Sequence, residues 1–295
     1  MASKELQAVL EILRAQPVRT DLSIQEMRAE FEAMPRFPLA EDVKCEAVDV
    51  RGMPAEWITT SESREGWVIY YLHGGGYVLG SINTHRELIS RLARAAGARA
   101  LAIDYRLAPE NPFPAAVADS TAGYRWLIAQ GVDSSKVVIA GDSAGGGLTV
   151  ATLLALRDAG DPLPAAGVCL SPWTDMECRW ESVTVPAGEE GILVRESVLR
   201  MARAYVGEAD PRTPLASPIH ADLTRLPPLL IQVGTAGDLL DDANRLAERA
   251  RADGVDVTLE TWDEMIHVWH TFAAILPEGQ QAIDRIGEFI REKSG

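Results

Sequence analysis

Short apolar runs alternate along most of the chain with longer segments of helical periodicity. The predicted buried strands, rich in apolar and β-branched residues, are 67–72, 98–105, 137–140, 166–171, 229–233 and 255–262. The segments with apolar residues at helical spacing are 85–96, 115–130, 148–156, 241–252 and 280–292. This alternation predicts an α/β fold, in which a mostly parallel sheet is covered by helices on both faces. Ligands bind such sheets beyond the carboxyl ends of the strands.

Three parts of the chain depart from this alternation. Residues 43–60 read as a hairpin with its turn at Arg51-Gly52, which brings the expected sheet to eight strands. Residues 1–42 carry apolar residues at helical spacing, and 173–220 is too long for an ordinary loop. We interpret 1–42 and 173–220, with a predicted helix at 197–205, as one helical cap. The main domain would then be formed by 43–172 and 221–295.

Composition and charge narrow the possible partners and location. The 295 residues carry a formal net charge of −15 and no basic run, so we predict no nucleic-acid partner. The three cysteines, Cys45, Cys169 and Cys178, lack metal-ligand spacing and are typical of a reducing compartment. The N-terminal segment has acidic residues among its apolar positions and no cleavage site, which argues against a signal peptide or membrane span. We therefore expect a cytoplasmic protein without stable membrane association.

The strand predicted at 137–140 runs directly into Gly141-Asp142-Ser143-Ala144-Gly145 and then into a helix. Glycines two positions either side of Ser143 allow the sharp strand-to-helix turn that lifts a serine hydroxyl above the end of a sheet. The spacing does not fit a dinucleotide-binding loop, which needs G-x-G-x-x-G. The strand before and the helix after make this G-x-S-x-G motif a candidate nucleophile site.

A second glycine-rich loop, His73-Gly74-Gly75-Gly76, follows the strand predicted at 67–72. Consecutive glycines let backbone N–H groups point into a cavity without a Cβ in the way. The amides of Gly75, Gly76 and Ala144 could together form an oxyanion hole, which stabilises the charge that develops on a carbonyl under attack. A flexible glycine hinge is the alternative reading of this loop.

A serine nucleophile needs a base and an acid that orients the base. Of the five histidines, His267 follows the last predicted strand closely, and His270 is its rival three residues later. His73 more plausibly orders the glycine loop. Asp238 follows the strand at 229–233 and is the candidate acid. Two other carboxylates, Asp241 and Asp242, are rivals, although the favourable dipole at a helix start already explains their position.

These motifs together resemble those of the bacterial hormone-sensitive-lipase-like carboxylesterases, which have the α/β-hydrolase fold. The matching stretches are H-G-G-G (73–76), D-Y-R-L-A-P-E (104–110), F-P-A-A (113–116), G-D-S-A-G-G (141–146) and M-I-H-V-W (265–269). The resemblance implies a triad of Ser143, His267 and Asp238, with Gly75, Gly76 and Ala144 as oxyanion donors. The residues around Asp238 depart from the family pattern D-P-L-R-D-E, because Leu239 replaces its proline.

The resemblance implies hydrolysis of short- to medium-chain carboxylic esters through an acyl-enzyme, without a metal or organic cofactor. Apolar residues that would line the substrate pocket are Met27, Phe31, Met34 and Trp173, although core packing explains them as well. A lactone hydrolase would use the same groups, and a ligand-binding protein on a hydrolase fold is an alternative of another class. The expected partner is a small-molecule ester, and the family suggests a homodimer.

Overall fold

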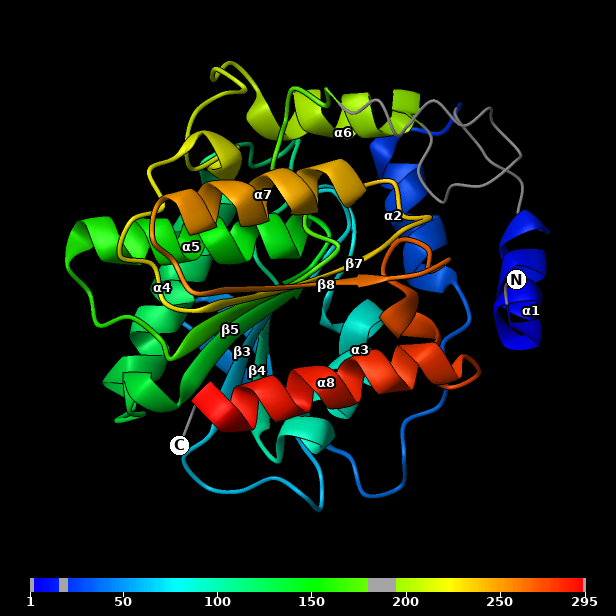
Figure 1. The fold of residues 1–295 in the computed structure, drawn as a ribbon, viewed down its shortest axis with the longest axis horizontal. Helices are drawn as coiled ribbons and strands as arrows, with labels where there is room; N and C mark the ends of the chain where they lie inside the picture. The colour runs from blue at the N-terminus through cyan, green and yellow to red at the C-terminus, as the bar shows by residue number, and fades with distance from the viewer. Residues whose placement is uncertain (1–2, 16–20, 180–194, 294–295) are drawn as a thin grey trace.

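The computed structural model describes residues 3–15, 21–179 and 195–293. These residues form one eight-stranded sheet in the order β1-β2-β4-β3-β5-β6-β7-β8 (Figure 1). The strands are Lys44–Val50 (β1), Met53–Thr59 (β2), Val68–Leu72 (β3), Arg99–Ile103 (β4), Val137–Asp142 (β5), Ala166–Leu170 (β6), Leu229–Gly234 (β7) and Val257–Trp262 (β8). Strand β2 is antiparallel to β1 and β4, and the remaining neighbours are parallel. The predicted fold class is confirmed.

Helices cover both faces of this sheet. The α-helices of the described residues are Lys4–Arg14 (α1), Ile24–Ala33 (α2), Ile82–Ala96 (α3), Ala115–Ala129 (α4), Ala144–Ala159 (α5), Arg195–Val206 (α6), Leu240–Ala252 (α7) and Pro277–Lys293 (α8). Helices α3 and α8 lie on one face of the sheet, and α5 and α7 lie on the other (Figure 1). Side chains of α3 and α8 form one core with the sheet, and those of α4, α5 and α7 form a larger one. The central strands are therefore buried on both sides, which explains their continuous apolar sequences.

Alternation along β3 shows how one strand serves both cores. Ile69 and Tyr71 pack in the core with α3 and α8, while Tyr70 and Leu72 pack in the core with α4 and α5. All four side chains are fully buried. The carboxyl end of β3 lies next to that of β5, where Leu72 pairs with Gly141. This register brings the glycine loop after β3 beside the turn that carries Ser143.

Local signals explain two element boundaries. The hairpin turn at Arg51 and Gly52 has positive φ at both residues, 58° and 88°, as a two-residue hairpin turn requires. Helix α3 begins at Ile82, three residues before the predicted start at His85. Ser81 caps it by accepting from the amide of Thr84, whose side chain in turn accepts from the amide of Ser81. The sequence prediction did not include this capping box and therefore placed the start of the helix nearly one turn too late.

The segments predicted as one cap contact each other in part. Helix α6 includes the predicted helix at 197–205, and residues 180–194 lie outside the described residues. Arg200 of α6 donates a 2.6 Å hydrogen bond to the carbonyl oxygen of Leu22, just before α2. Helix α1 instead packs through Leu6 and Val9 on the loop after β8. The N-terminal helices thus have two different contact partners.

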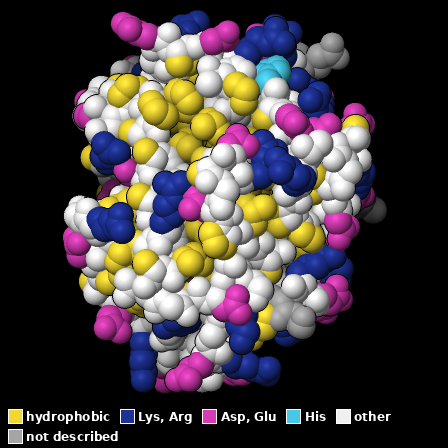
Figure 2. Space-filling view, turned by 90° about the vertical axis from the view of Figure 1, so that its left-hand side faces the viewer, with side chains coloured by type: hydrophobic (Ala, Val, Ile, Leu, Met, Phe, Trp, Pro, Cys, Tyr) yellow, Lys and Arg dark blue, Asp and Glu magenta, His cyan; other side chains and the backbone are white. Residues whose placement is uncertain are grey.

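The surface carries charges of both signs. On the face drawn in Figure 2, basic and acidic side chains are interspersed with apolar ones, and its described side chains form no continuous basic stripe. Within the described ranges, none of the helices has the length and apolar character needed to span a bilayer.

Candidate active site

Ser143 occupies the sharp turn between β5 and α5. Its backbone is strained, with φ 53° and ψ −120°. A Cβ at Gly145 would lie 2.0 Å from the carbonyl oxygen of Leu72, and one at Gly141 would lie 2.3 Å from the carbonyl oxygen of Gly145. Only glycine fits at both positions, as predicted from the motif. The turn places the Ser143 hydroxyl at the carboxyl edge of the sheet, beside the N-terminus of α5.

His267 meets Ser143 at this edge. Its Nε2 lies 3.0 Å from Oγ of Ser143, although the two residues are far apart in sequence. Burial lowers the pKa of His267 to about 4, against an opposing effect of the Asp142 carboxylate. The imidazole is therefore neutral near pH 7 and can accept the serine proton. The rival His270 is engaged elsewhere, since its Nε2 lies 2.8 Å from Oε1 of Gln232.

Asp238 follows β7, and its side chain is buried, with 7 % exposed. The turn before it approaches the base closely, because a Cβ at Gly237 would lie 3.7 Å from the amide nitrogen of His267. Nδ1 of His267 is buried and has no hydrogen-bond partner among the described residues. The hydrogen bond that would orient the imidazole is thus not formed here, and the role of Asp238 stays a prediction.

The two rival carboxylates have other partners. Asp242 accepts hydrogen bonds from the backbone amides of Thr174 and Asp175, at 2.6 and 3.0 Å. Asp241 lies 3.4 Å from Arg245, one helical turn along α7. Both roles are structural, which favours Asp238 as the acid.

The glycine loop has the backbone that an oxyanion hole needs. Gly75 and Gly76 have φ of 112° and 62°. A Cβ would lie 2.3 Å from the carbonyl oxygen of Leu79 at the first position and 2.4 Å from Sδ of Met201 at the second. In the described loops, neither glycine amide donates to a backbone acceptor. Ala144 is the first residue of α5, so its amide has no acceptor within the helix.

A buried carboxylate joins this loop to the serine turn. Oδ1 of Asp142 accepts hydrogen bonds from the hydroxyl of Tyr71 at 2.7 Å and the amide of Gly74 at 3.0 Å. Its Oδ2 lies 3.3 Å from Nε2 of His85. Burial would raise the pKa of Asp142, but His85 and the Tyr71 hydroxyl lower it to about 2. The ionised carboxylate therefore holds the glycine loop against the residue that precedes the nucleophile.

His73 orders the same loop, as predicted. Its Nδ1 lies 2.7 Å from the carbonyl oxygen of Gly74, and its ring stacks on Tyr105 with 4.3 Å between centroids. The Tyr105 hydroxyl donates to the carbonyl oxygen of His73 at 2.7 Å. Burial lowers the pKa of His73 to about 3, so this imidazole is neutral and has a structural role in the packing of the loop.

The residues predicted to line the pocket have different surroundings. Trp173 is buried, and its amide donates to the carbonyl oxygen of Ser143 at 2.9 Å. Met27 and Phe31 are partly buried against the larger core, while Met34 is 37 % exposed. Sequence reasoning missed Met201, whose contact with the glycine loop depends on how α6 folds back over the sheet. The part that the four predicted residues play in substrate binding stays a prediction.

The fold and the contact between Ser143 and His267 are typical of the α/β-hydrolase class of proteins. A family described as having the α/β-hydrolase fold matches residues 69–271. An acetyl-hydrolase from Streptomyces hygroscopicus is 47% identical over 296 residues, covering 100% of this chain and 99% of that protein. The crystal structure of an esterase from the bacterial hormone-sensitive lipase family has a TM-score of 0.95 and 52% identity, covering 100% of both chains. The structure of EstE5, soaked with p-nitrophenyl butyrate, has a TM-score of 0.96 and 48% identity, covering 99% of both chains.

The chain belongs to the bacterial hormone-sensitive-lipase family of the α/β-hydrolase fold, and it is a carboxylic ester hydrolase. The family resemblance predicted from the motifs is thereby confirmed. The alternative of a ligand-binding protein is wrong, because an acetyl-hydrolase and the esterase structures match this chain over nearly its whole length.

Proposed function

We propose that the chain hydrolyses short- to medium-chain carboxylic esters with Ser143 as nucleophile. The 3.0 Å contact between Ser143 Oγ and His267 Nε2 carries this proposal. His267 takes the hydroxyl proton as Oγ attacks the ester carbonyl, and the oxyanion accepts from the amides of Gly75, Gly76 and Ala144. The alcohol leaves with the proton from His267. Water, activated by the same imidazole, then releases the acid from the acyl-enzyme.

The third member of the proposed triad is Asp238. The loop that carries it already packs near the His267 backbone. As the acceptor for Nδ1 of His267, the Asp238 carboxylate would hold the reactive tautomer and stabilise the imidazolium. Catalytic hydrogen bonds are often long or unformed without substrate.

The proposed acyl-chain range has two supports. One relative is named an acetyl-hydrolase, and crystals of EstE5 were soaked with p-nitrophenyl butyrate. Met201 also closely approaches Gly76, so the cap narrows the space next to the oxyanion loop. Both observations favour small acyl groups over long lipid chains.

The test combines a variant with a substrate series. Ser143→Ala should abolish hydrolysis of p-nitrophenyl butyrate while the circular dichroism spectrum and melting temperature stay close to wild type. The wild type should hydrolyse the acetate and butyrate faster than the palmitate. Turnover by Ser143→Ala near the wild-type rate, or a preference for palmitate, would contradict the proposal.

A further inference from the structure

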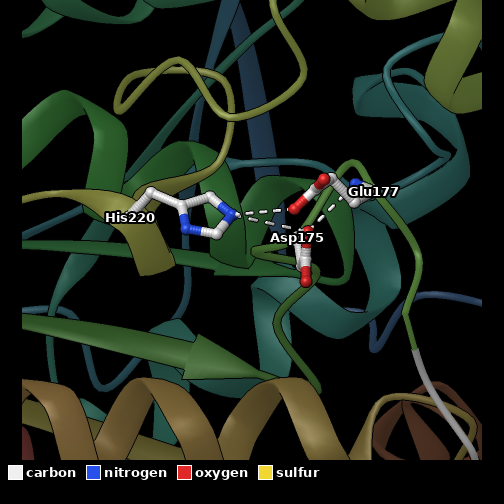
Figure 3. Close-up of side chains that lie close together, drawn as sticks. All are labelled: Asp175, Glu177 and His220. Carbon is white, nitrogen blue, oxygen red and sulfur yellow. Dashed lines mark hydrogen bonds and ion pairs between the residues drawn. The ribbon is translucent and has the colours of Figure 1, made fainter.

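Three metal-ligating side chains converge at a second place, between the segment after β6 and the 3₁₀ helix Pro218–His220 (Figure 3). They are Asp175, Glu177 and His220, and their ligating atoms all lie within 4.8 Å of one another. Nε2 of His220 is 3.5 Å from Oε2 of Glu177 and 3.8 Å from Oδ1 of Asp175. Nothing in the proposed ester hydrolysis uses these three groups.

Two of the converging atoms face each other at 3.5 Å but lack hydrogen bonds within the described ranges. Oε2 of Glu177 and Nε2 of His220 are both buried atoms without a hydrogen bond among the described residues. Buried polar atoms in native proteins almost always form hydrogen bonds. The absence of hydrogen bonds at these two atoms therefore needs an explanation. The 3.5 Å and 3.8 Å separations are too long for good hydrogen bonds from a protonated imidazole.

Arginines hold the outer oxygen of each carboxylate. Arg245 Nη1 donates to Oδ2 of Asp175 at 2.9 Å, and Arg179 Nη2 donates to Oε1 of Glu177 at 2.7 Å. The inner oxygens Oδ1 and Oε2 therefore face His220, as Figure 3 shows. This arrangement matches metal sites in which second contacts orient the ligands.

The remaining contacts of the inner oxygens leave room for a further partner. Oδ1 of Asp175 accepts from the amide of Glu177 at 2.9 Å, and Nε of Arg212 lies 3.9 Å from Oε2 of Glu177. A carboxylate oxygen can accept a second bond. The exposed Arg212 guanidinium is too distant to hydrogen-bond there.

We propose that Asp175, Glu177 and His220 bind one divalent transition-metal ion of the Zn²⁺ class. Bonds of about 2 Å to ligands in a tetrahedral arrangement place ligand atoms about 3.4 Å apart, close to the 3.5 Å and 3.8 Å between His220 and the two carboxylate oxygens. The imidazole nitrogen favours Zn²⁺ over Mg²⁺ or Ca²⁺, which prefer oxygen ligands.

The ion would brace the polypeptide next to the nucleophile. The amide of Trp173 donates to the carbonyl oxygen of Ser143, and the Trp173 indole donates to the carbonyl oxygen of Asp175. A metal at Asp175 and His220 would tie this segment to the chain that leads into β7. The role is structural, since none of the three ligands touches the Ser143–His267 pair in the described contacts.

The test uses Zn²⁺ itself as the probe. Chelator-treated, full-length protein is titrated with Zn²⁺ by calorimetry, and the melting temperature is measured with and without the ion. We expect one Zn²⁺ per chain with micromolar affinity, and a melting temperature higher by about 5 °C when Zn²⁺ is about a hundredfold above its Kd. Co²⁺ in place of Zn²⁺ should give the visible absorption of a tetrahedral site.

Two ligand variants and a matched control decide the assignment. Glu177→Gln and His220→Asn should each weaken Zn²⁺ binding at least about tenfold and remove the thermal shift. Glu208→Gln, which changes an exposed carboxylate elsewhere in the same region of the chain, should bind like wild type. The proposal is overturned if the wild type binds no Zn²⁺ below millimolar concentration. It is equally overturned if both ligand variants bind as the wild type does, which would place the ion elsewhere, such as at His267.

Discussion

Asp142 and His85 form a buried ion pair, with 3.3 Å between Oδ2 and Nε2 and each side chain only 5% exposed. Burial alone would lower the pKa of His85, but the Asp142 carboxylate outweighs it and raises the pKa. The same carboxylate accepts from the amide of Gly74 and so fixes the oxyanion loop. The Asp142 carboxylate, which lies in the serine turn, thus contacts both helix α3 and the loop after β3.

Removing that charge should damage both stability and catalysis. We expect Asp142→Asn to lower the free energy of unfolding by about 3 kcal/mol, because a buried His85 loses its counter-charge. The kcat for p-nitrophenyl butyrate should fall about 100-fold, because a small misplacement of the oxyanion donors is costly. Urea unfolding and initial-rate kinetics measure the two effects.

An exposed ion pair supplies the control for this variant. Asp161 lies 2.6 Å from Arg125 at the surface, with side chains 23% and 47% exposed. Asp161→Asn should cost less than about 1 kcal/mol and leave kcat unchanged. Equal losses in the two variants would show that burial of the Asp142 charge has no special role.

The pH dependence of activity should reflect the buried base. Burial lowers the pKa of His267 to about 4, well below its ordinary 6.5. Protonation removes the base, so kcat/KM should be at its full value above this pKa and fall as the pH drops through about 4. Initial rates on p-nitrophenyl butyrate between pH 3.5 and 8 at constant ionic strength measure the acid limb. A limb near 6.5 would mean that His267 is solvated in the working enzyme.

Helix α1 should support the base from a distance. Leu6 and Val9 are buried against Met265, Ile266 and Trp269, in the loop that carries His267. Leu6→Ala should lower the free energy of unfolding by about 3 kcal/mol and reduce kcat, because the cavity loosens this loop. Thermal unfolding and single-turnover kinetics measure the change.

The same helix provides its own control. Ile12 is 47% exposed, so Ile12→Ala should change the free energy of unfolding by no more than about 0.5 kcal/mol. If Leu6→Ala left both stability and kcat at wild-type values, α1 would not support the His267 loop.

The sheet and the nucleophile could be predicted from local sequence signals. Buried parallel strands give continuous apolar runs in the sequence. The strained turn at Ser143 requires flanking glycines, which can be recognised directly in the sequence. His267 followed from its position after the last strand. Each of these signals lies within a few residues of the feature it predicts.

The missed features depend on contacts between distant segments. Nothing near His85 indicates that it pairs with Asp142, because the pair forms only when α3 packs against the sheet. The approach of Asp175 to His220 likewise depends on the path of the chain between β6 and β7. The contact of α1 with the His267 loop was missed because an amphipathic helix does not specify which surface it covers.

Substitution of the proposed acid gives the strongest test of the triad. Asp238→Asn preserves the size of the side chain but removes the charge that would hold His267 and stabilise its protonated form. We expect kcat to fall by about 10³- to 10⁴-fold with a small change in KM, since the loss arises in the transition state. The melting temperature should stay near the wild-type value.

Asp241 is the matched control, because it lies three residues away and its side chain is 42% exposed beside Arg245. Asp241→Asn should keep kcat within about twofold of wild type, because an exposed ion pair contributes little. If Asp238→Asn were as active as this control, another group would have to orient His267.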